Sequence, residues 1–436
     1  DDMGLGKTVQ VLSYLLAMKQ NGQTLPSLIV CPASLVLNWA EECQKFTPEL
    51  SCVVVDGDAA HRAELAESWP AADLVVTSYD LLRRDEALYE GQEFYACILD
   101  EAQAIKNHTT QKYKAVCKVR SRVRFALTGT PVENRLGELW SIFSFLMPGY
   151  LPPYKSFCSR FEKPIVQEED QTAVRRLNQL TGPFILRRMK SDVLKELPPK
   201  TENVYRIELE EEQRKLYLAA VVDAREKLQA AKPEDKMAVF AVLMRLREIC
   251  CDPRLIADNW EGGSAKLDAC VELVSSAVEG GHRILLFSQF TSMLELLAKR
   301  LDAEGISHFT LQGSTPKPVR AELVRRFNGG EVSVFLISLR AGGTGLNLTA
   351  ADIVIHYDPW WNVAAQNQAT DRAYRIGQQN PVQVYKLIAQ DTIEEKIVEL
   401  QQAKQSLADT VTGTADGAIL SMRPDELLQL LEGSEP

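Results

Sequence analysis

Residues 1–8 of the sequence read DDMGLGKT, which resembles a phosphate-binding loop in its glycines, lysine and hydroxyl. Gly4 and Gly6 allow the backbone to curl so that successive N–H groups point at a polyphosphate. Lys7 can reach the β- and γ-phosphates, and the Thr8 hydroxyl can bind Mg²⁺. The next residues are apolar at helical spacing, so the phosphates would meet a helix N-terminus. The stretch predicts a site for ATP and Mg²⁺, although Asp1 stands where the strict motif has glycine; a glycine-rich turn before a helix is the alternative.

The composition is that of an ordinary globular protein, with 436 residues of which 45% are hydrophobic and 25% charged. This length predicts two or three domains, and no apolar run approaches the length of a membrane span. The nine cysteines show no metal-ligand spacing, which favours reduced thiols in an intracellular protein. Because the net charge is −10, any nucleic acid must be held by local basic patches.

Residues 1–135 alternate helical patterns with short apolar runs, which predicts an α/β lobe with a parallel sheet buried on both faces. The runs are 28–31, 52–55, 74–77, 97–99 and 125–127. Polar residues follow several of these runs. In open α/β sheets ligands bind at the carboxyl ends of the strands, so these residues should meet the phosphate loop at one edge.

The rest of the chain predicts helical and α/β regions in turn. Residues 136–200 and 201–263 read as two helical protrusions, the second opening with an extended connector at 201–209. Residues 264–400 resume the alternation, with runs at 283–287, 307–310, 332–337, 353–355 and 382–387, but without a phosphate loop. Residues 401–436 predict a C-terminal helical brace. Two lobes and one phosphate loop favour an ATP site at the lobe interface.

Two groups of residues could supply catalysis. Asp100 follows an apolar strand and could hold Mg²⁺ together with Thr8, while Glu101 could orient and deprotonate water. An acidic helix N-cap is the alternative. Arg372 and Arg375 are three residues apart on an expected helix, so they would share a face and could neutralise charge in a phosphoryl-transfer transition state. Their alternative is a solvated basic helix face.

The ordered motifs resemble those of the SWI/SNF-type ATPases of helicase superfamily two, and the short helical insertions are more similar to the bacterial members. They are DDMGLGKT (1–8), DEAQ (100–103), LTGTPVEN (127–134), FILRR (184–188), LREICC (246–251), AGGTGLNL (341–348) and QATDRAYRIGQ (368–378). The resemblance covers nearly the whole chain. Val363 departs from it, because many relatives have proline there.

The resemblance implies two RecA-like lobes that use ATP and Mg²⁺ to move along double-stranded DNA and displace or remodel bound protein, such as RNA polymerase. It assigns catalysis to Lys7, Glu101, Arg372 and Arg375. Nucleotide contacts are further expected from Gly4, Gly6, Thr8, Asp100, Gln103 and Gly345. It also implies that a strand and an adenine-contacting glutamine segment precede Asp1, so we expect an N-terminally truncated fragment whose first lobe lacks its first strand.

DNA contacts implied by the resemblance fall on backbone N–H groups and hydroxyls at strand ends, which suit phosphates and carry no sequence preference. They are Ser34, Thr77, Ser78, Gln312, Gly313, Ser338, Gly342, Gly343, Thr344 and Trp361. Trp360 and Trp361 could wedge against DNA, with core packing an equal alternative for one of them. The alternating basic residues of 118–124 favour a solvated strand edge over a phosphate stripe.

Two other functions remain open from the sequence. One is a helicase that separates strands of DNA or acts on RNA, and the other is a non-catalytic nucleic-acid-binding scaffold. For the leading reading we expect a monomer in the bacterial cytoplasm, associated with the nucleoid, or in the nucleus if the source is eukaryotic.

Overall fold

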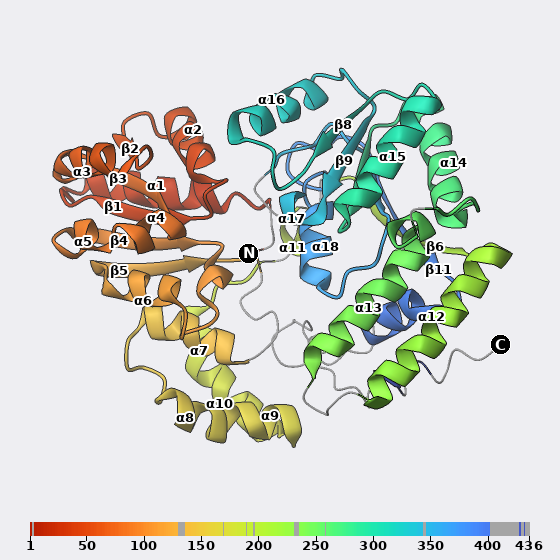
Figure 1. The fold of residues 1–436 in the computed structure, drawn as a ribbon. Coiled ribbons are helices and arrows are strands. Elements are labelled where there is room, and N and C mark those ends of the chain that lie inside the picture. The colour runs from red at the N-terminus through yellow and green to blue at the C-terminus, as the bar shows by residue number, and fades with distance from the viewer. Residues whose placement is uncertain are drawn as a thin grey trace. The chain divides into compact units, whose positions relative to one another are not determined.

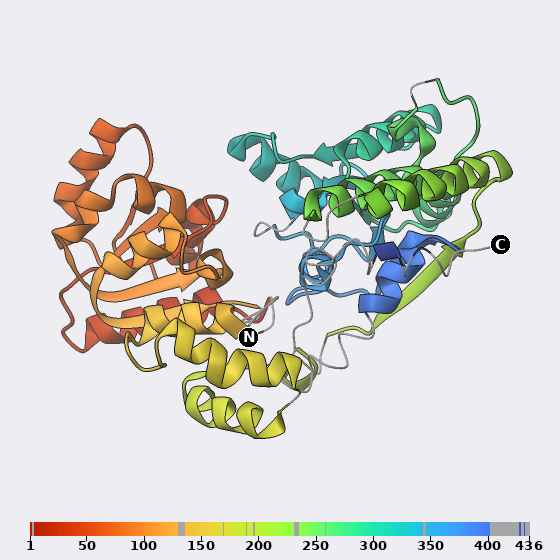
Figure 2. The ribbon, with the colours of Figure 1, turned by 60° about the horizontal axis from the view of Figure 1, so that its bottom comes forward.

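The computed structural model describes residues 1, 4–129, 136–168, 170–188, 190–194, 197–230, 235–257, 259–342, 346–401, 427, 428 and 431. The chain forms two compact units, residues 1–195 and residues 196–436, and each is built on its own parallel sheet. Figures 1 and 2 show the first unit in red to yellow and the second in green to blue. The predicted α/β class with two parallel sheets is therefore confirmed.

The sheet of the first unit has the strand order β2-β3-β1-β4-β5, and all its pairings are parallel. Its strands are β1 (Ser27–Cys31), β2 (Cys52–Val54), β3 (Leu74–Ser78), β4 (Glu93–Asp100) and β5 (Arg120–Leu127). Each contains one of the apolar runs predicted from the sequence. Arg122 of the edge strand β5 pairs with Glu93 at 3.2 Å, as expected for a solvated edge. Arg124 differs from that expectation, because it is half-buried and donates to the carbonyl of Phe145 at 2.7 Å.

Helices cover both faces of this sheet, because successive side chains of a strand point to opposite faces. Ile29 and Cys31 pack with α1 (Lys7–Gln20) and α2 (Val36–Phe46). Leu28 and Val30 pack on the other side, in a core that includes residues of α4, α5, α6 and α7. The remaining helices of the lobe are α3 (Ala59–Ser68), α4 (Tyr79–Arg84), α5 (Glu86–Glu90), α6 (Gln111–Lys118) and α7 (Leu136–Leu146).

The end of the first unit is helical, as predicted. It comprises α8 (Tyr154–Phe157), a π-helical turn (Cys158–Glu162), α9 (Lys163–Gln167), α10 (Gln171–Thr181) and α11 (Lys190–Val193). Asp170 caps α10 by accepting from the backbone N–H of Thr172 at 2.7 Å, which satisfies one of the free donors at a helix start.

The sheet of the second unit has the order β6-β11-β10-β7-β9-β8, again entirely parallel. Its strands are β6 (Lys200–Ile207), β7 (Ile284–Ser288), β8 (His308–Leu311), β9 (Val334–Ser338), β10 (Ile353–His356) and β11 (Val382–Ala389). One face packs on α14 (Ala265–Glu279) and α15 (Thr291–Ala303). The other face packs with residues of α16 (Lys317–Asn328), α17 (Leu339–Gly342) and α18 (Val363–Thr370).

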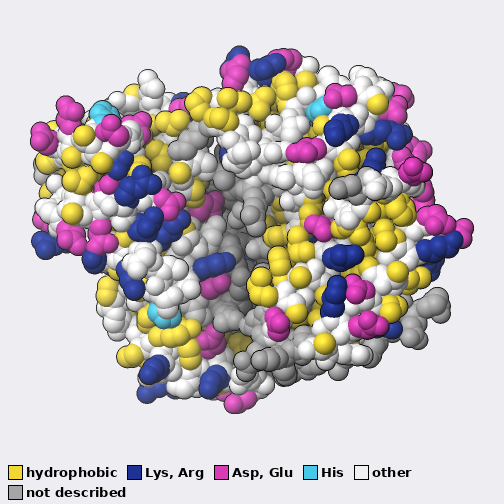
Figure 3. All heavy atoms as spheres, in the orientation of Figure 1, with side chains coloured by type: hydrophobic (Ala, Val, Ile, Leu, Met, Phe, Trp, Pro, Cys, Tyr) yellow, Lys and Arg dark blue, Asp and Glu magenta, His cyan; other side chains and the backbone are white. Residues whose placement is uncertain are grey.

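Two long helices, α12 (Glu211–Ala230) and α13 (Lys236–Cys251), form a hairpin beside this sheet (Figures 1 and 2). Their apolar core also contains Trp361, Ile393, Ile397, Leu427 and Leu431. Hydrophobic side chains also gather on the surface over the hairpin (Figure 3), and Met237 is 75% exposed. Of the expected C-terminal brace, residue 401 belongs to a helix that starts at 393, and only residues 427, 428 and 431 are described further on.

None of the nine cysteines forms a disulfide, and most are buried. Burial raises the pKa of Cys97 and of Cys270 to about 12 each. Within the described residues no helix is long and apolar enough to cross a membrane.

One stretch differs from its prediction: residues 201–209 were expected to be a connector, but most of them belong to the edge strand β6. This strand pairs with β11 along its whole length, from Lys200 with Val382 to Ile207 with Ala389. The sequence hides the strand because only Ile207 is buried, so its alternation is weak. Charge adds to this backbone pairing, since the Glu202 carboxylate accepts from Lys200 and from Lys386 of β11, each at 2.8 Å.

We predict that Glu202→Gln loosens β6. Burial alone would raise the pKa of Glu202, but the two lysines outweigh it and lower the pKa to about 2. A carboxylate whose pKa is lower in the folded protein stabilises the fold at any pH above its pKa in the unfolded chain. This stabilisation is lost as the pH falls from about 4.5 to about 2. Because solvent screens this partly exposed group, we expect Glu202→Gln to lower the local stability of β6 by about 1 kcal/mol at pH 7. This corresponds to about fivefold faster amide exchange in the strand.

The matched control is Glu322→Gln, which removes an exposed carboxylate paired with Arg325 within one helix. Amide exchange followed by mass spectrometry at pH 7 should be unchanged in β6 of this variant. Equal exchange of β6 in wild type and Glu202→Gln at pH 7 would show that the charged ladder does not hold the strand.

Candidate active site

The phosphate loop leads directly into helix α1, as the sequence predicts. Gly4 and Gly6 have φ angles of 81° and 72°, a left-handed conformation that favours glycine. Gly6 is the N-cap residue, so Lys7 and Thr8 are the first two residues of α1. This places both side chains at the helix end whose free N–H groups and dipole favour anions.

Arg188 contacts the phosphate loop from a distant part of the first unit. The Nη2 atom of Arg188 lies 2.6 Å from Oδ2 of Asp1, and its backbone N–H donates to Oδ1 at 3.2 Å. Lys7 donates its Nζ–H to the backbone carbonyl of Asp1 at 2.8 Å. Arg188 belongs to the FILRR motif at 184–188, but sequence reasoning did not assign it to the site. Contacts between residues 187 positions apart leave no local signal in the sequence.

Lys7 and Arg188 line a cavity of about 610 Å³ in the first unit. Asp1, Arg124, Thr128 and Gly129 also line it, and apolar side chains of α1, β5 and α7 line much of the remainder. A mostly apolar cavity of this size with a few polar groups is typical of a small-molecule site.

Asp100 ends strand β4 and is only 9% exposed. Its Oδ2 accepts from the indole Nε1–H of Trp39 at 2.9 Å, and its Oδ1 accepts from the backbone N–H of Glu101 at 2.9 Å. Burial and the neighbouring charge of Glu101 raise the pKa of Asp100 to about 6, although these hydrogen bonds and Lys7 act in the opposite direction. A carboxylate in this environment gains from a cation beside it.

Glu101 adopts a left-handed backbone conformation, with φ of 50°. Such a conformation costs a non-glycine residue on the order of 1 kcal/mol and is concentrated at functional sites. The Gln103 amide donates to Oε2 of Glu101 at 2.7 Å, and the Thr128 hydroxyl donates to Oε1 of Gln103 at 2.9 Å. Gln103, expected to contact nucleotide, therefore links the carboxylate of Glu101 to the end of β5.

The residues present fit a magnesium ion bound together with ATP. Within the described part of the chain no three or more His, Cys, Asp or Glu side chains form a metal cage. Mg²⁺ rarely requires one, because it usually keeps several waters and binds one or two carboxylates plus the phosphates of its substrate. Asp100 and the Thr8 hydroxyl would hold it.

The arginines lie in the second unit, and their local structure differs from the prediction. Helix α18 ends at Thr370, so Arg372 and Arg375 lie in the turns of residues 371–378, here called the arginine segment. The expected shared helix face is therefore wrong. The helix stops because the Gln378 amide binds the backbone carbonyls of Thr349, Ala351 and Ala373, which draws the segment onto the lobe.

Within this segment, Arg372 is buried, and its carbonyl accepts from the N–H of Leu348 at 3.0 Å. Arg375 is half-buried, and its Nη1 lies 3.5 Å from the carbonyl of Leu346. Gly345, the other expected nucleotide contact of this unit, lies outside the described residues.

Residues 1–255 match the family model of the SNF2-related domain, and residues 265–377 match that of the helicase conserved C-terminal domain. The chain belongs to the SNF2-related family. This family consists of DNA-dependent ATPases, and Lys7, Asp100 and Glu101 lie within the part that matches its model.

Two curated relatives illustrate the family. An uncharacterized ATP-dependent helicase of Mycoplasma pneumoniae is 41% identical over 99% of this chain and 42% of its own length. The TATA-binding protein-associated factor MOT1 of Saccharomyces cerevisiae is 34% identical over 99% of this chain and 27% of its own length. The chain thus spans less than half the length of these relatives.

A solved SNF2-family structure, the SWI2/SNF2 ATPase core of Sulfolobus solfataricus in complex with dsDNA, is 35% identical in sequence. The match covers 98% of this chain and 90% of that one, with a TM-score of 0.47.

The DNA contacts expected for this SNF2-family chain differ in exposure. In the first unit Thr77 and Ser78 are buried. The Thr77 hydroxyl accepts from Tyr89 at 2.8 Å, and that of Ser78 accepts from the N–H of Leu81 at 3.2 Å. These two hydroxyls are therefore engaged as acceptors inside the unit, and their contacts with DNA stay a prediction. The Ser34 hydroxyl is also buried, but it has no hydrogen-bond partner among the described residues.

In the second unit Gln312 and Gly313 follow strand β8, and Gly313 is exposed. Ser338 is buried at the end of β9, and Gly342 ends α17. Gly343 and Thr344 lie outside the described residues. Trp361 is only 5% exposed and packs in the core of the α12–α13 hairpin, as the alternative for one of the two tryptophans expects, and its contact with DNA stays a prediction.

We predict that the indole of Trp39 sets the affinity for Mg²⁺. Trp39→Phe keeps an aromatic ring but removes the only side-chain donor that contacts Asp100 in the described part of the chain. Removing such an outer hydrogen bond usually weakens metal binding about 10-fold or more. The Mg²⁺ concentration that half-saturates ATP hydrolysis, and that supports binding of a fluorescent ADP, should therefore rise by about this factor.

Trp69→Phe is the matched control. Trp69 is as deeply buried in the same unit, but its indole N–H has no hydrogen-bond partner among the described residues. This variant should need no more Mg²⁺ than the wild type. Equal Mg²⁺ dependence in the two variants would exclude a specific role for Trp39.

Proposed function

We propose that this chain is an ATP-driven motor that moves along double-stranded DNA and displaces or remodels protein bound there. The observation that carries the proposal is the hydrogen-bonded series of Asp100, Glu101, Gln103 and Thr128 beside the glycines and lysine of the phosphate loop. This series connects Asp100, the proposed ligand of Mg²⁺, to Glu101, the proposed general base, and to Thr128 after strand β5.

In this proposal each residue has a separate part in hydrolysis. Lys7 binds the β- and γ-phosphates, while Asp100 and Thr8 hold Mg²⁺, which neutralises phosphate charge when it is bound. Glu101 accepts the proton of the attacking water at Oε1, because Oε2 is engaged by Gln103. The strained backbone of Glu101 and the Gln103 amide keep this carboxylate in one orientation.

Double-stranded DNA is the proposed track. In support, the Sulfolobus core that is 35% identical was solved with dsDNA. The association of MOT1 with TATA-binding protein supports a DNA-bound protein as the client, and RNA polymerase is one such protein. We further propose that the protein acts as a monomer in the bacterial cytoplasm, at the nucleoid.

A strand-separating helicase is the second candidate, favoured by the match to the helicase C-terminal domain and by the helicase among the relatives. The two candidates share the ATP site and differ only in what happens to the duplex. One experiment can therefore separate them.

We expect blunt duplex DNA to stimulate ATP hydrolysis without release of a labelled strand. Stimulation should be indifferent to duplex sequence and fall steeply with salt, since backbone phosphates are the proposed contacts. Glu101→Gln should bind ATP but not hydrolyse it, whereas Lys7→Ala should bind ATP poorly. Strand release would support the helicase, and DNA binding without any turnover would support a non-catalytic scaffold.

We also predict that the arginine segment contributes to turnover and not to ATP binding. By analogy with arginines that act in trans, Arg372→Ala or Arg375→Ala should lower DNA-stimulated kcat about 10³-fold, with ATP affinity nearly unchanged. Lysine should replace either one poorly, because the planar fork is lost. Arg325→Ala on the exposed face of α16 is the control. Near-normal kcat in both single variants would contradict this role.

A further inference from the structure

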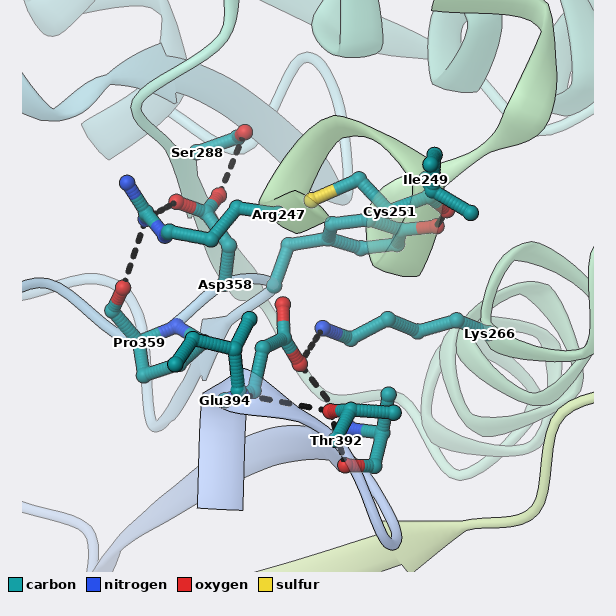
Figure 4. Close-up of polar contacts among 12 residues, drawn as sticks. Arg247, Ile249, Cys251, Lys266, Ser288, Asp358, Pro359, Thr392 and Glu394 are labelled. Atoms are coloured by element: carbon teal, nitrogen blue, oxygen red, sulfur yellow. Dashed lines mark hydrogen bonds and ion pairs between the residues drawn. The ribbon is translucent and has the colours of Figure 1, made fainter. Parts of the chain in front are cut away.

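Arg247, on helix α13, carries a guanidinium that is completely buried in the second unit. Its Nη2 donates to Oδ2 of Asp358 at 3.0 Å and to the carbonyl of Pro359 at 2.7 Å (Figure 4). A charge that has been taken out of water is stable only while its partners stay in place. Arg247 therefore fixes the chain immediately after strand β10.

Asp358 is shared with a third element. Its second oxygen, Oδ1, accepts from the Ser288 hydroxyl at 2.6 Å and from the N–H of Gln289 at 3.2 Å, both at the end of strand β7 (Figure 4). Arg247 and Asp358 are 111 residues apart in the sequence. One carboxylate thus joins the α12–α13 hairpin to the carboxyl edge of the sheet.

The guanidinium also packs on aromatic rings. It lies 4.3 Å from the ring centroid of Trp361, 5.4 Å from that of Phe290 and 5.7 Å from that of Trp360. A cation over an aromatic face is attracted to it, and the attraction grows when water is excluded. Residues 358–361 are therefore held by charge on one side and by stacking on the other.

This clamped stretch runs directly into helix α18. Asn362 caps the helix by accepting from the N–H of Ala365 at 2.6 Å, and the helix ends at Thr370, two residues before Arg372. An α-helix of eight residues is a rigid rod of about 12 Å. A change of direction at its cap is therefore carried to the arginine segment at its other end.

The far end of α18 is held by packing of Ala369 in the core and by a hydrogen bond to the sheet. The Thr370 hydroxyl lies 2.9 Å from Nε2 of His356, and burial lowers the pKa of this histidine to about 3, so the ring is neutral. With the far end held there, the attachment at the other end contributes to the orientation of the helix. That second attachment is the stretch held by Arg247.

We propose that Arg247 is a positioning residue for ATP turnover, which sets the orientation of α18 through Asp358 and Trp361 and so places Arg372 and Arg375. The effect on turnover rests on the function proposed above for these arginines. The geometry gives the α12–α13 hairpin a direct mechanical connection to the arginine segment. Displacing the hairpin would move the segment.

The same unit offers a matched control in a second buried ion pair. Nζ of Lys266 lies 2.5 Å from Oε2 of Glu394, and both side chains are completely buried (Figure 4). This pair joins α14 to residues after β11, and Oε2 also accepts from the N–H of Ala389 at 2.9 Å. Within the described chain neither side chain forms a hydrogen bond with residues 358–362. Nζ of Lys266 lies 5.4 Å from the ring centroid of Tyr357, and Glu394→Gln leaves this lysine in place. Its loss should disturb stability but not the arginine segment.

The test compares Asp358→Asn with Glu394→Gln in the full chain. Both changes neutralise the acid of a buried pair without altering its shape, so both should lower the melting temperature. Only Asp358→Asn should lower kcat with saturating duplex DNA, by about 10-fold, with KM for ATP nearly unchanged. Arg247→Lys, which keeps the charge but loses the planar contact with Trp361, should show the same split if Asp358→Asn folds poorly.

Amide exchange of residues 363–375 without nucleotide provides a readout that does not depend on activity. It should become faster in Asp358→Asn and stay unchanged in Glu394→Gln. If the wild type shows no DNA-stimulated hydrolysis, the proposed function fails, and this exchange still decides whether Arg247 holds the segment. Equal exchange and equal loss of kcat in the two variants would overturn the positioning role.

Discussion

A strand that is buried on both faces can place a polar side chain only where the strand ends. This constraint organises both units, because the central strands of each sheet are covered by helices on either side. In the first unit Asp100 and Glu101 lie at the end of β4, with Thr128 just beyond β5. In the second unit Ser288 ends β7 and Asp358 follows β10. The candidate catalytic residues of the first unit and the buried contacts of Ser288 and Asp358 in the second unit thus lie at the same place in the fold, the carboxyl ends of the strands.

Burial of charge serves different purposes in the two units. Asp100 accepts two hydrogen bonds but has no arginine or lysine in a direct ion pair among those described, and its raised pKa reflects a site suited to a cation. Arg247 and Asp358 form a direct buried ion pair, and so do Lys266 and Glu394. A paired buried charge resists displacement, so these contacts suit a region that must keep its geometry while other parts of the molecule work.

Much of the fold could be predicted from the sequence, because the central strands are continuous apolar runs separated by helical patterns. The edge strand β6 could not, since its residues are mostly exposed and only the distant β11 gives them a partner. In the candidate site, Lys7, Asp100 and Glu101 follow from local motifs. Trp39 and Arg188 do not, because their roles depend on contacts across 61 and 187 residues. The predicted helix through Arg372 is not formed, and the Gln378 side chain instead donates to the carbonyls of Thr349 and Ala351, which are distant in the sequence.

Burial of the thiols affects how the protein responds to oxidation. Oxidants attack the thiolate, and Cys97 in the first sheet and Cys270 on α14 are both kept protonated by burial. Peroxide therefore has little access to either of these two sulfurs while the chain is folded. A molecule that opens exposes one of these sulfurs, and its oxidation adds polar oxygen where the core has no room for it. Oxidation of these two thiols would then prevent the refolding of molecules that have already unfolded and would leave folded molecules unaffected.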